Sequence, residues 1–327
     1  MVVRVIAIDW SGDATAGGQR NHIWAASVDD GRLTGLSSGR TRVEVIDFVI
    51  SQSAGADGLM VGLDFAFSFP AWFPRQLGIG EVGDLWEVVA RDGEDWLTRC
   101  EAPFWGRPGT RRPDLPGHLR ITDSSCQPVA GISPKSVFQI GGAGAVGTGS
   151  LRGMPYLRRL RRAGFAIWPF DPPGRLTVIE IYPRALTGAV TKSDRASRAA
   201  YLDSWDIPEP LRRRAQDSED AFDAAISALV MSRHTAELAA LEPTEDPDVR
   251  LEGSIWVPPS GSGPAVDRPA PADRRPPPPA LSDLQREIAA ILSDVEGIEA
   301  RLQRVRRSAQ ALVREELSPE PGSPGPF

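Results

Sequence analysis

Two apolar segments that each end in an acidic residue constrain this chain most. The first is VVRVIAID, residues 2–9, and the second is GLMVGLDF, residues 58–65. Apolar runs of this length, rich in β-branched residues, are typical of strands that are covered on both faces of a sheet. A carboxylate at the end of such a strand costs desolvation free energy unless a partner offsets it. Asp9 and Asp64 are therefore either turn-forming residues or members of a charged site.

The remaining elements follow from hydrophobic periodicity and turn residues. Further strands are expected at 21–28, 32–38 and 175–182, and helices at 42–53, 81–100, 154–163, 193–203 and 218–234. The early order is three strands, a helix and a strand, which predicts an α/β fold with a mixed sheet flanked by helices. Residues 70–150 are rich in Trp, Pro and Gly, and we expect an irregular insertion there.

A change of composition near residue 257 marks a domain boundary. Residues 1–256 are expected to form one domain, followed by a Pro-rich disordered linker at 257–280. Residues 281–317 repeat apolar positions at spacings of four and three, which predicts a coiled-coil helix. Residues 318–327 are expected to be a disordered tail. The coiled coil implies a homo-oligomer or a partner helix. A lone amphipathic helix docked on the main domain remains the alternative for 281–317.

Charge and hydropathy limit the class of protein. The net charge is −6 and the isoelectric point is about 5.3, which excludes a protein that coats nucleic acid electrostatically but allows one local phosphate-binding site. Without an apolar run of about 18 residues or a signal peptide, we expect no membrane association and a cytoplasmic location. Cys100 and Cys126 should be free thiols. The three histidines, His22, His118 and His234, have no zinc-site spacing, and none is expected beside the acids.

Three more acids join Asp9 and Asp64 as candidates. Glu180 lies in the strand LTVIEIY, and Asp220 and Asp223 are three apart, so they share one face near the start of a helix. There the helix dipole favours the ionised carboxylate. Each acid also has a structural alternative as a turn residue, a helix cap or, for Glu180, a salt-bridge partner. The combined order is more specific than any single residue, and carboxylate oxygens suit magnesium or manganese.

The segments that carry these acids resemble the domain-of-unknown-function 429 family, a group of predicted RNase H-like nucleases. The similarity spans residues 2–234 and is carried by IAIDWSG (6–12), GLDFAFSFP (62–70), EIYPRA (180–185) and EDAFDAAISAL (219–229). A more distant similarity connects the chain to Holliday-junction resolvases of the same fold. The resemblance implies that Asp9, Asp64 and Asp223 are metal ligands, with Asp220 next. Glu180 matches the family's own Glu-x-Tyr-Pro segment.

Substrate contacts are predicted on basic residues near a glycine-rich segment, GGAGAVGTG, at 141–149. Its backbone N–H groups, with Arg152 close by, are suited to surround a phosphate, although a flexible linker is the alternative. Arg158 and Lys135 are further candidates for contacts with a phosphate backbone.

The resulting prediction is a magnesium- or manganese-dependent nuclease that uses Asp9, Asp64, Glu180, Asp220 and Asp223 to hydrolyse nucleic acid. One alternative is an ATP-dependent phosphotransferase of the actin-like class, because the turn Asp9-Trp10-Ser11-Gly12 loosely resembles its phosphate-binding turn. Another is a non-catalytic adaptor that recruits a partner through 281–317.

Overall fold

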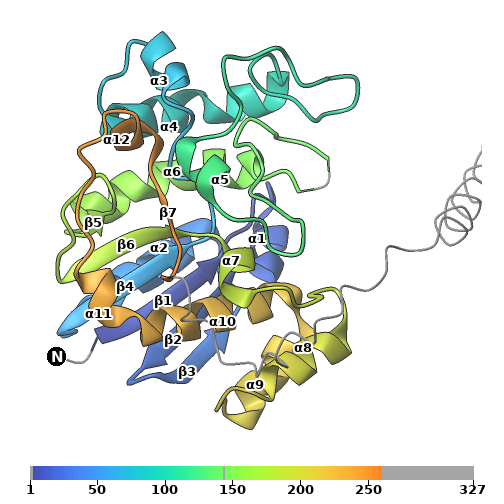
Figure 1. The fold of residues 1–327 in the computed structure, drawn as a ribbon, viewed down its shortest axis with the longest axis vertical. Helices are drawn as coiled ribbons and strands as arrows, with labels where there is room; N and C mark the ends of the chain where they lie inside the picture. Colours follow the sequence, from blue (N-terminus) through green and yellow to red (C-terminus); the bar gives the residue numbers. More distant parts are fainter. Residues whose placement is uncertain (1–2, 143, 260–327) are drawn as a thin grey trace, which may run out of the picture. The chain divides into compact units, whose positions relative to one another are not determined.

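The computed structural model describes residues 3–142 and 144–259. These residues form a 7-stranded mixed sheet in the order β3-β2-β1-β4-β6-β5, with β7 also beside β6 (Figure 1). The strands are β1 (Val3–Asp9), β2 (Trp24–Asp29), β3 (Arg32–Ser37), β4 (Gly58–Leu63), β5 (Ala166–Ile167), β6 (Leu176–Ile181) and β7 (Ile255–Trp256). The predicted α/β class with a mixed sheet flanked by helices is confirmed.

The directions of the strands decide where the acids gather. β1, β2 and β3 form an antiparallel meander, whereas β1, β4 and β6 run parallel to one another. Parallel strands place their carboxyl ends at the same edge of the sheet, where α/β proteins usually bind ligands. Three acids therefore reach one edge of the sheet. They are Asp9 at the end of β1, Asp64 just after β4, and Glu180 near the end of β6.

Helices cover both faces of the sheet (Figure 1). Ile8 and Val61 belong to the core on the side of α2 (Arg42–Ser51), α4 (Val82–Arg99) and α6 (Gly147–Arg162). Met60 belongs to the core on the opposite side. That side is covered by α10 (Glu219–Arg233), which packs on β1 and β2. The expectation that strand 58–65 is covered on both faces is thus confirmed.

Shorter helices complete the described fold. They are α1 (Ala16–His22), α3 (Trp72–Gln76), α5 (Ile121–Ser125), α7 (Pro183–Thr187), α8 (Arg195–Leu202), α9 (Glu209–Asp217), α11 (Thr235–Ala239) and α12 (Val249–Glu252). Residues 21–22, predicted to begin a strand, instead end α1, because Thr15 caps this helix by accepting a hydrogen bond from the Gly18 N–H at 3.0 Å.

The segment predicted to be an irregular insertion contributes to the core. Within it, α4 spans 18 residues and buries Leu85, Trp86 and Val89 against the rest of the domain. The expected helix near 81–100 is confirmed, and the remainder of the segment consists largely of turns around α3 and α5.

The helix expected at 154–163 begins earlier, at Gly147, so the end of the glycine-rich segment is helical. Close packing explains the glycines. A Cβ at Gly147 would lie 2.2 Å from the Val137 carbonyl oxygen, and one at Gly153 would lie 2.7 Å from the Phe65 ring. At these two positions glycine allows α6 to approach its neighbours, so the flexible-linker alternative is wrong for this part.

All these elements belong to the first of two compact units, Met1–Val266. Apart from 257–259, the predicted linker, coiled coil and tail lie outside the described residues. Cys100 and Cys126 are free thiols. Among the described helices, none has both the length and the apolar character needed to cross a membrane.

Candidate functional site

Asp9 and Asp64 lie beside each other at the sheet edge. In the parallel ladder between β1 and β4, Ile8 pairs with Leu63, and the Asp64 N–H donates to the Ile8 carbonyl oxygen at 3.1 Å. Each aspartate is the next residue after this last pair. Both residues are half-buried, at the end of an otherwise buried pair of strands.

The start of α10 brings two more acids to the same edge. Ser218 accepts a hydrogen bond from the Ala221 N–H at 3.2 Å and fixes the first turn. One turn further, Asp223 is 8% exposed, and because α10 packs on β1 its carboxylate faces the strand ends. Asp220 lies farther out, with 35% of its side chain exposed.

Burial and mutual repulsion raise the pKa values of three of these acids. Burial is the main cause for Asp9, whose pKa is raised well above the ordinary value, with further contributions from Asp64 and Asp223. Burial and then Asp223 raise the pKa of Asp64 to about 8. The pKa of Asp223 is also raised by burial, against the opposing effect of Lys192. Closely spaced carboxylates of this kind favour a cation between them.

Lys192 supplies a positive charge at this site, and the sequence analysis missed it. Its ammonium group pairs with the Asp223 carboxylate, and only 16% of its side chain is exposed. Two arginines hold the loop that carries it: Arg184 donates to the Val190 carbonyl oxygen at 2.8 Å, and Arg198 donates to the carbonyl of Lys192 itself. No local motif marks Lys192, because only the tertiary fold places it against α10.

His22 also reaches the cluster, contrary to the expectation that no histidine adjoins the acids. Its Nδ1 lies 3.1 Å from Oδ2 of Asp220. The expectation failed because α1, which ends at His22, was not predicted. His22 is more than half exposed, at 59% of its side chain, so this pair marks the outer rim of the cluster.

Glu180 is engaged in a separate buried network. Arg120 donates to both of its oxygens, at 2.8 and 2.5 Å, and the Phe67 N–H donates to Oε2 at 2.9 Å. Burial raises the pKa of Glu180, while Arg120 opposes that rise. Glu180 lies close enough for its charge to raise the pKa of Asp64. The salt-bridge alternative therefore describes its contacts.

The turn after Asp9 is held in place by two arginines. Arg42 donates to the carbonyl oxygens of Ser11 and Asp13 at 2.9 and 2.8 Å, and Arg152 donates to that of Gly12 at 2.5 Å. Arg152 also pairs with Glu94 at 2.7 Å. The structure thus gives Arg152, predicted to bind substrate, a role in fixing the turn that presents Asp9.

A pocket of about 460 Å³ opens beside the acids. Asp64 lies in its wall, together with the turn at 10–13, the start of α6 and Tyr182, and Glu180 with Arg120 also lines it. Burial raises the pKa of Tyr182 to about 12, so this phenol keeps its proton. Lys135, a predicted substrate contact, is among the lining residues, whereas Arg158 pairs with Glu87 on α4.

The donor set suits a hard divalent cation. The chemistry fits because the donors are carboxylates with raised pKa values, and the buried Oδ1 of Asp223 has no hydrogen-bond partner among the described residues. Within residues 3–142 and 144–259, however, no three His, Cys, Asp or Glu side chains are grouped closely enough to form a ready-made metal cage. Magnesium retains several waters, so one or two carboxylates per ion are sufficient.

The chain was compared with protein-family models, curated proteins and solved structures. No protein-family model, curated protein or solved structure matches the chain.

Proposed function

We propose that this protein is a divalent-metal-dependent nuclease that hydrolyses phosphodiester bonds of nucleic acid. One observation carries the proposal: Asp9, Asp64 and Asp223 converge at one sheet edge from β1, β4 and α10, with raised pKa values and beside an open pocket. Surplus carboxylate charge of this kind costs folding free energy, and such costs are concentrated at functional sites.

Asp9, Asp64 and Asp223 are the residues that would hold magnesium or manganese, with Asp220 contributing negative charge from the first turn of α10. When bound, the metal supplies Lewis acidity and a lowered pKa for a water nucleophile. The chain's own residues present the carboxylates: Arg42 and Arg152 hold the turn after Asp9, and the β1–β4 ladder sets Asp64 beside it.

Lys192 has a defined part in this proposal. In the structure its ammonium group offsets the negative charge of Asp223. A divalent cation at the carboxylates would compete with this lysine, and the released ammonium would be free to pair with a phosphate oxygen of the substrate. Glu180 would assist indirectly, since it anchors the edge next to Asp64 through Arg120.

The resemblance to the domain-of-unknown-function 429 family supports the same reading. It implies an RNase H-like arrangement, and it is carried by the segments that hold the acids, at 6–12, 62–70, 180–185 and 219–229. Because fold alone does not define activity, the proposal depends on the acidic site.

The test is cleavage of labelled single-stranded, duplex and branched DNA and RNA with magnesium or manganese. Wild type is compared with Asp9→Asn and with a matched control, Asp206→Asn. The Asp206 side chain is 89% exposed and pairs with Arg32, outside the acidic cluster. We expect metal-dependent cleavage that falls about 100-fold or more in Asp9→Asn, equivalent to roughly 2.7 kcal/mol, and is unchanged in the control.

Absence of cleavage on every substrate, with folded protein at saturating metal, would contradict the proposal. Thermal stabilisation by ATP in that case would favour the phosphotransferase alternative.

A further inference from the structure

The arginines first expected to contact a phosphate backbone are neutralised by neighbouring acids. Arg152 pairs with Glu94, Arg158 with Glu87, and Arg159, on the same helix, with Asp47. Each of these ion pairs must be broken before its arginine can neutralise a phosphate. The face of α6 is therefore a poor place for a nucleic acid to bind.

The loop between Trp105 and α5 has the opposite character. Arg107, Arg111 and Arg112 are exposed there, and within the described part of the chain none of them forms an ion pair. The side-chain contact of Arg112 is with His118, at 3.5 Å between Nη1 and Nε2. Burial and then Arg112 lower the pKa of His118, and an imidazole carries no negative charge that could compensate the charge of Arg112.

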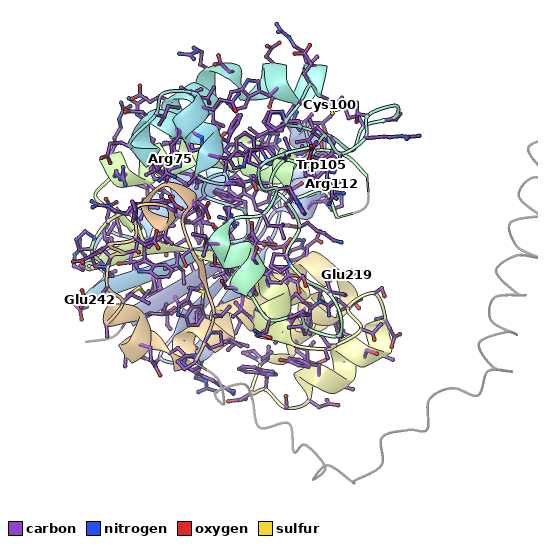
Figure 2. The ribbon with its side chains drawn as sticks, turned by 45° about the horizontal axis from the view of Figure 1, so that its top comes forward. Arg75, Cys100, Trp105, Arg112, Glu219 and Glu242 are labelled. Carbon is purple, nitrogen blue, oxygen red and sulfur yellow. The ribbon has the colours of Figure 1, made fainter. Side chains whose placement is uncertain are left out.

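This loop is anchored. Thr110 Oγ1 donates to the Arg107 carbonyl oxygen at 2.8 Å and accepts from the Gly106 N–H at 3.1 Å, and Trp72 Nε1 donates to the Gly117 carbonyl oxygen at 2.7 Å. These bonds hold the arginine-bearing turn against the domain. Figure 2 labels Arg112 near Trp105, whose ring contacts His118 at a centroid distance of 6.2 Å.

The end of the loop adjoins the pocket. Ser136 Oγ donates to the His118 carbonyl oxygen at 2.5 Å, so the neighbouring residue, Lys135, lies beside the base of the loop. Lys135 lines the pocket that also contains Asp64. Within residues 3–142 and 144–259, Lys135 likewise forms no ion pair. Unneutralised positive charge is thus present both on the loop and in the wall of the pocket that Asp64 lines.

We infer that Arg107, Arg111 and Arg112, continued by Lys135, form a surface that binds the sugar-phosphate backbone of the nucleic acid substrate. This inference rests on the proposed function. Because the whole protein carries a charge of −6, only a local concentration of unpaired cations can attract a polyanion. Contacts of this kind fix the position of a strand without reading its sequence.

The test compares two triple variants that lose the same charge. One is Arg107→Gln, Arg111→Gln and Arg112→Gln. The other, the matched control, is Arg91→Gln, Arg158→Gln and Arg159→Gln, one exposed and two half-buried arginines that pair with acids. Circular dichroism first establishes that both are folded. Fluorescence anisotropy with labelled DNA and RNA, without divalent metal, then gives the dissociation constant as a function of salt.

We expect the loop variant to bind at least tenfold more weakly than wild type at 100 mM salt. Its salt slope should fall by about 2, since each lost phosphate contact removes roughly 0.7–0.9. Equal affinities and slopes for the two triple variants would overturn the inference, as would absence of binding by wild type.

Hydrolysis of bis(p-nitrophenyl) phosphate separates this inference from the proposed function. This small diester has no long backbone, so the loop variant should hydrolyse it at the wild-type rate. If the folded loop variant does not hydrolyse this diester, the loop has a role besides binding the nucleic-acid backbone, and the assignment is overturned. A third outcome is hydrolysis that depends on Asp9 while nucleic-acid binding is unchanged in the loop variant. It would refute the proposed binding surface but not the proposed nuclease activity. Loop-dependent binding without any hydrolysis would refute the nuclease instead.

Discussion

Two groups of acids lie at the same edge of the sheet and differ in how their charges are satisfied. In the first, Arg120 donates to both oxygens of Glu180 and to both oxygens of Asp123, from Nη2 to Oδ1 at 2.8 Å and from Nε to Oδ2 at 3.1 Å. In the second, the ion pair that Lys192 forms among the described residues is with Asp223, while Asp9 and Asp64 remain close to that carboxylate.

The difference separates structural acids from candidate catalytic ones. A guanidinium with a rigid fork satisfies two carboxylates at fixed geometry, whereas a lysine on a flexible stem offsets one and can leave it. Asp223 accordingly retains a buried oxygen without a partner among the described residues. Sequence position alone would assign Glu180 and Asp64 to one group, since both lie at the ends of apolar strands.

The largest effect is expected at the satisfied group. Arg120→Met removes the cation that pairs with Glu180 and Asp123 within the described part of the chain and leaves both carboxylates buried. We predict a loss of about 3–5 kcal/mol in the free energy of unfolding, measured by urea denaturation near pH 7.

Arg20→Met is the matched control, because Arg20 pairs with Glu44 at the surface. The Arg20 side chain is 43% exposed and the Glu44 side chain 47% exposed. Such exposed pairs contribute about 0–1 kcal/mol. Equal losses for the two variants would show that the Arg120 network is not a structural group.

An opposite sign is expected at the unsatisfied group. Asp64→Asn removes a carboxylate whose pKa is raised to about 8 in the folded protein. In metal-free protein at pH 8 we predict an increase of roughly 1–3 kcal/mol in the free energy of unfolding. This is less than the full rise would give at about 1.4 kcal/mol per pKa unit, because solvent at this half-buried residue screens part of the repulsion. Urea denaturation in chelator measures it, and a stability loss in this variant would contradict the distinction between the groups.

The same pKa predicts a pH dependence. The folded state holds a proton on Asp64 that the unfolded state releases near pH 4, so ionisation of Asp64 costs stability as pH rises from about 4 to about 8. Metal-free wild type should therefore lose stability over this interval relative to Asp64→Asn. Thermal unfolding at several pH values measures the difference, and parallel curves for the two proteins would refute it.

A smaller effect is expected from the lysine. At pH 8.5, above the pKa of about 8 of Asp64, Lys192→Met removes a cation that competes with divalent metal. We predict an affinity for magnesium several-fold to about tenfold tighter, or roughly 1 kcal/mol. Calorimetric titration measures it. Arg195→Met is the control, because Arg195 pairs with Asp217. Weaker binding in Lys192→Met than in this control would assign the lysine a supporting role in the metal site.

Much of the fold and part of the site follow from sequence patterns. Apolar runs predict the two strands that lead to Asp9 and Asp64. The spacing of Asp220 and Asp223 predicts that they share one face of a helix. The parallel pairing of β1 with β4 then brings the first two acids together, as strand ends of one sheet edge.

The rest depends on contacts between residues far apart in the chain. Lys192 reaches Asp223 from a loop 31 positions earlier, and Arg120 reaches Glu180 across 60 positions. Neither pair has a local pattern, so Glu180 could not be distinguished from the other strand acids. Arg152 and Arg158 were predicted as phosphate contacts for the same reason: their partners, Glu94 and Glu87, lie on α4.

The central claim is that Asp9, Asp64 and Asp223 hold a divalent metal, and isothermal titration of magnesium and manganese tests it most directly. Wild type, Asp9→Asn, Asp64→Asn, Asp223→Asn and the control Asp206→Asn are titrated at pH 8.5. The account predicts binding by wild type and the control and a loss of at least about tenfold in affinity, roughly 1.4 kcal/mol, in each folded site variant. Equal affinity in all five proteins, or no binding by wild type, would contradict it.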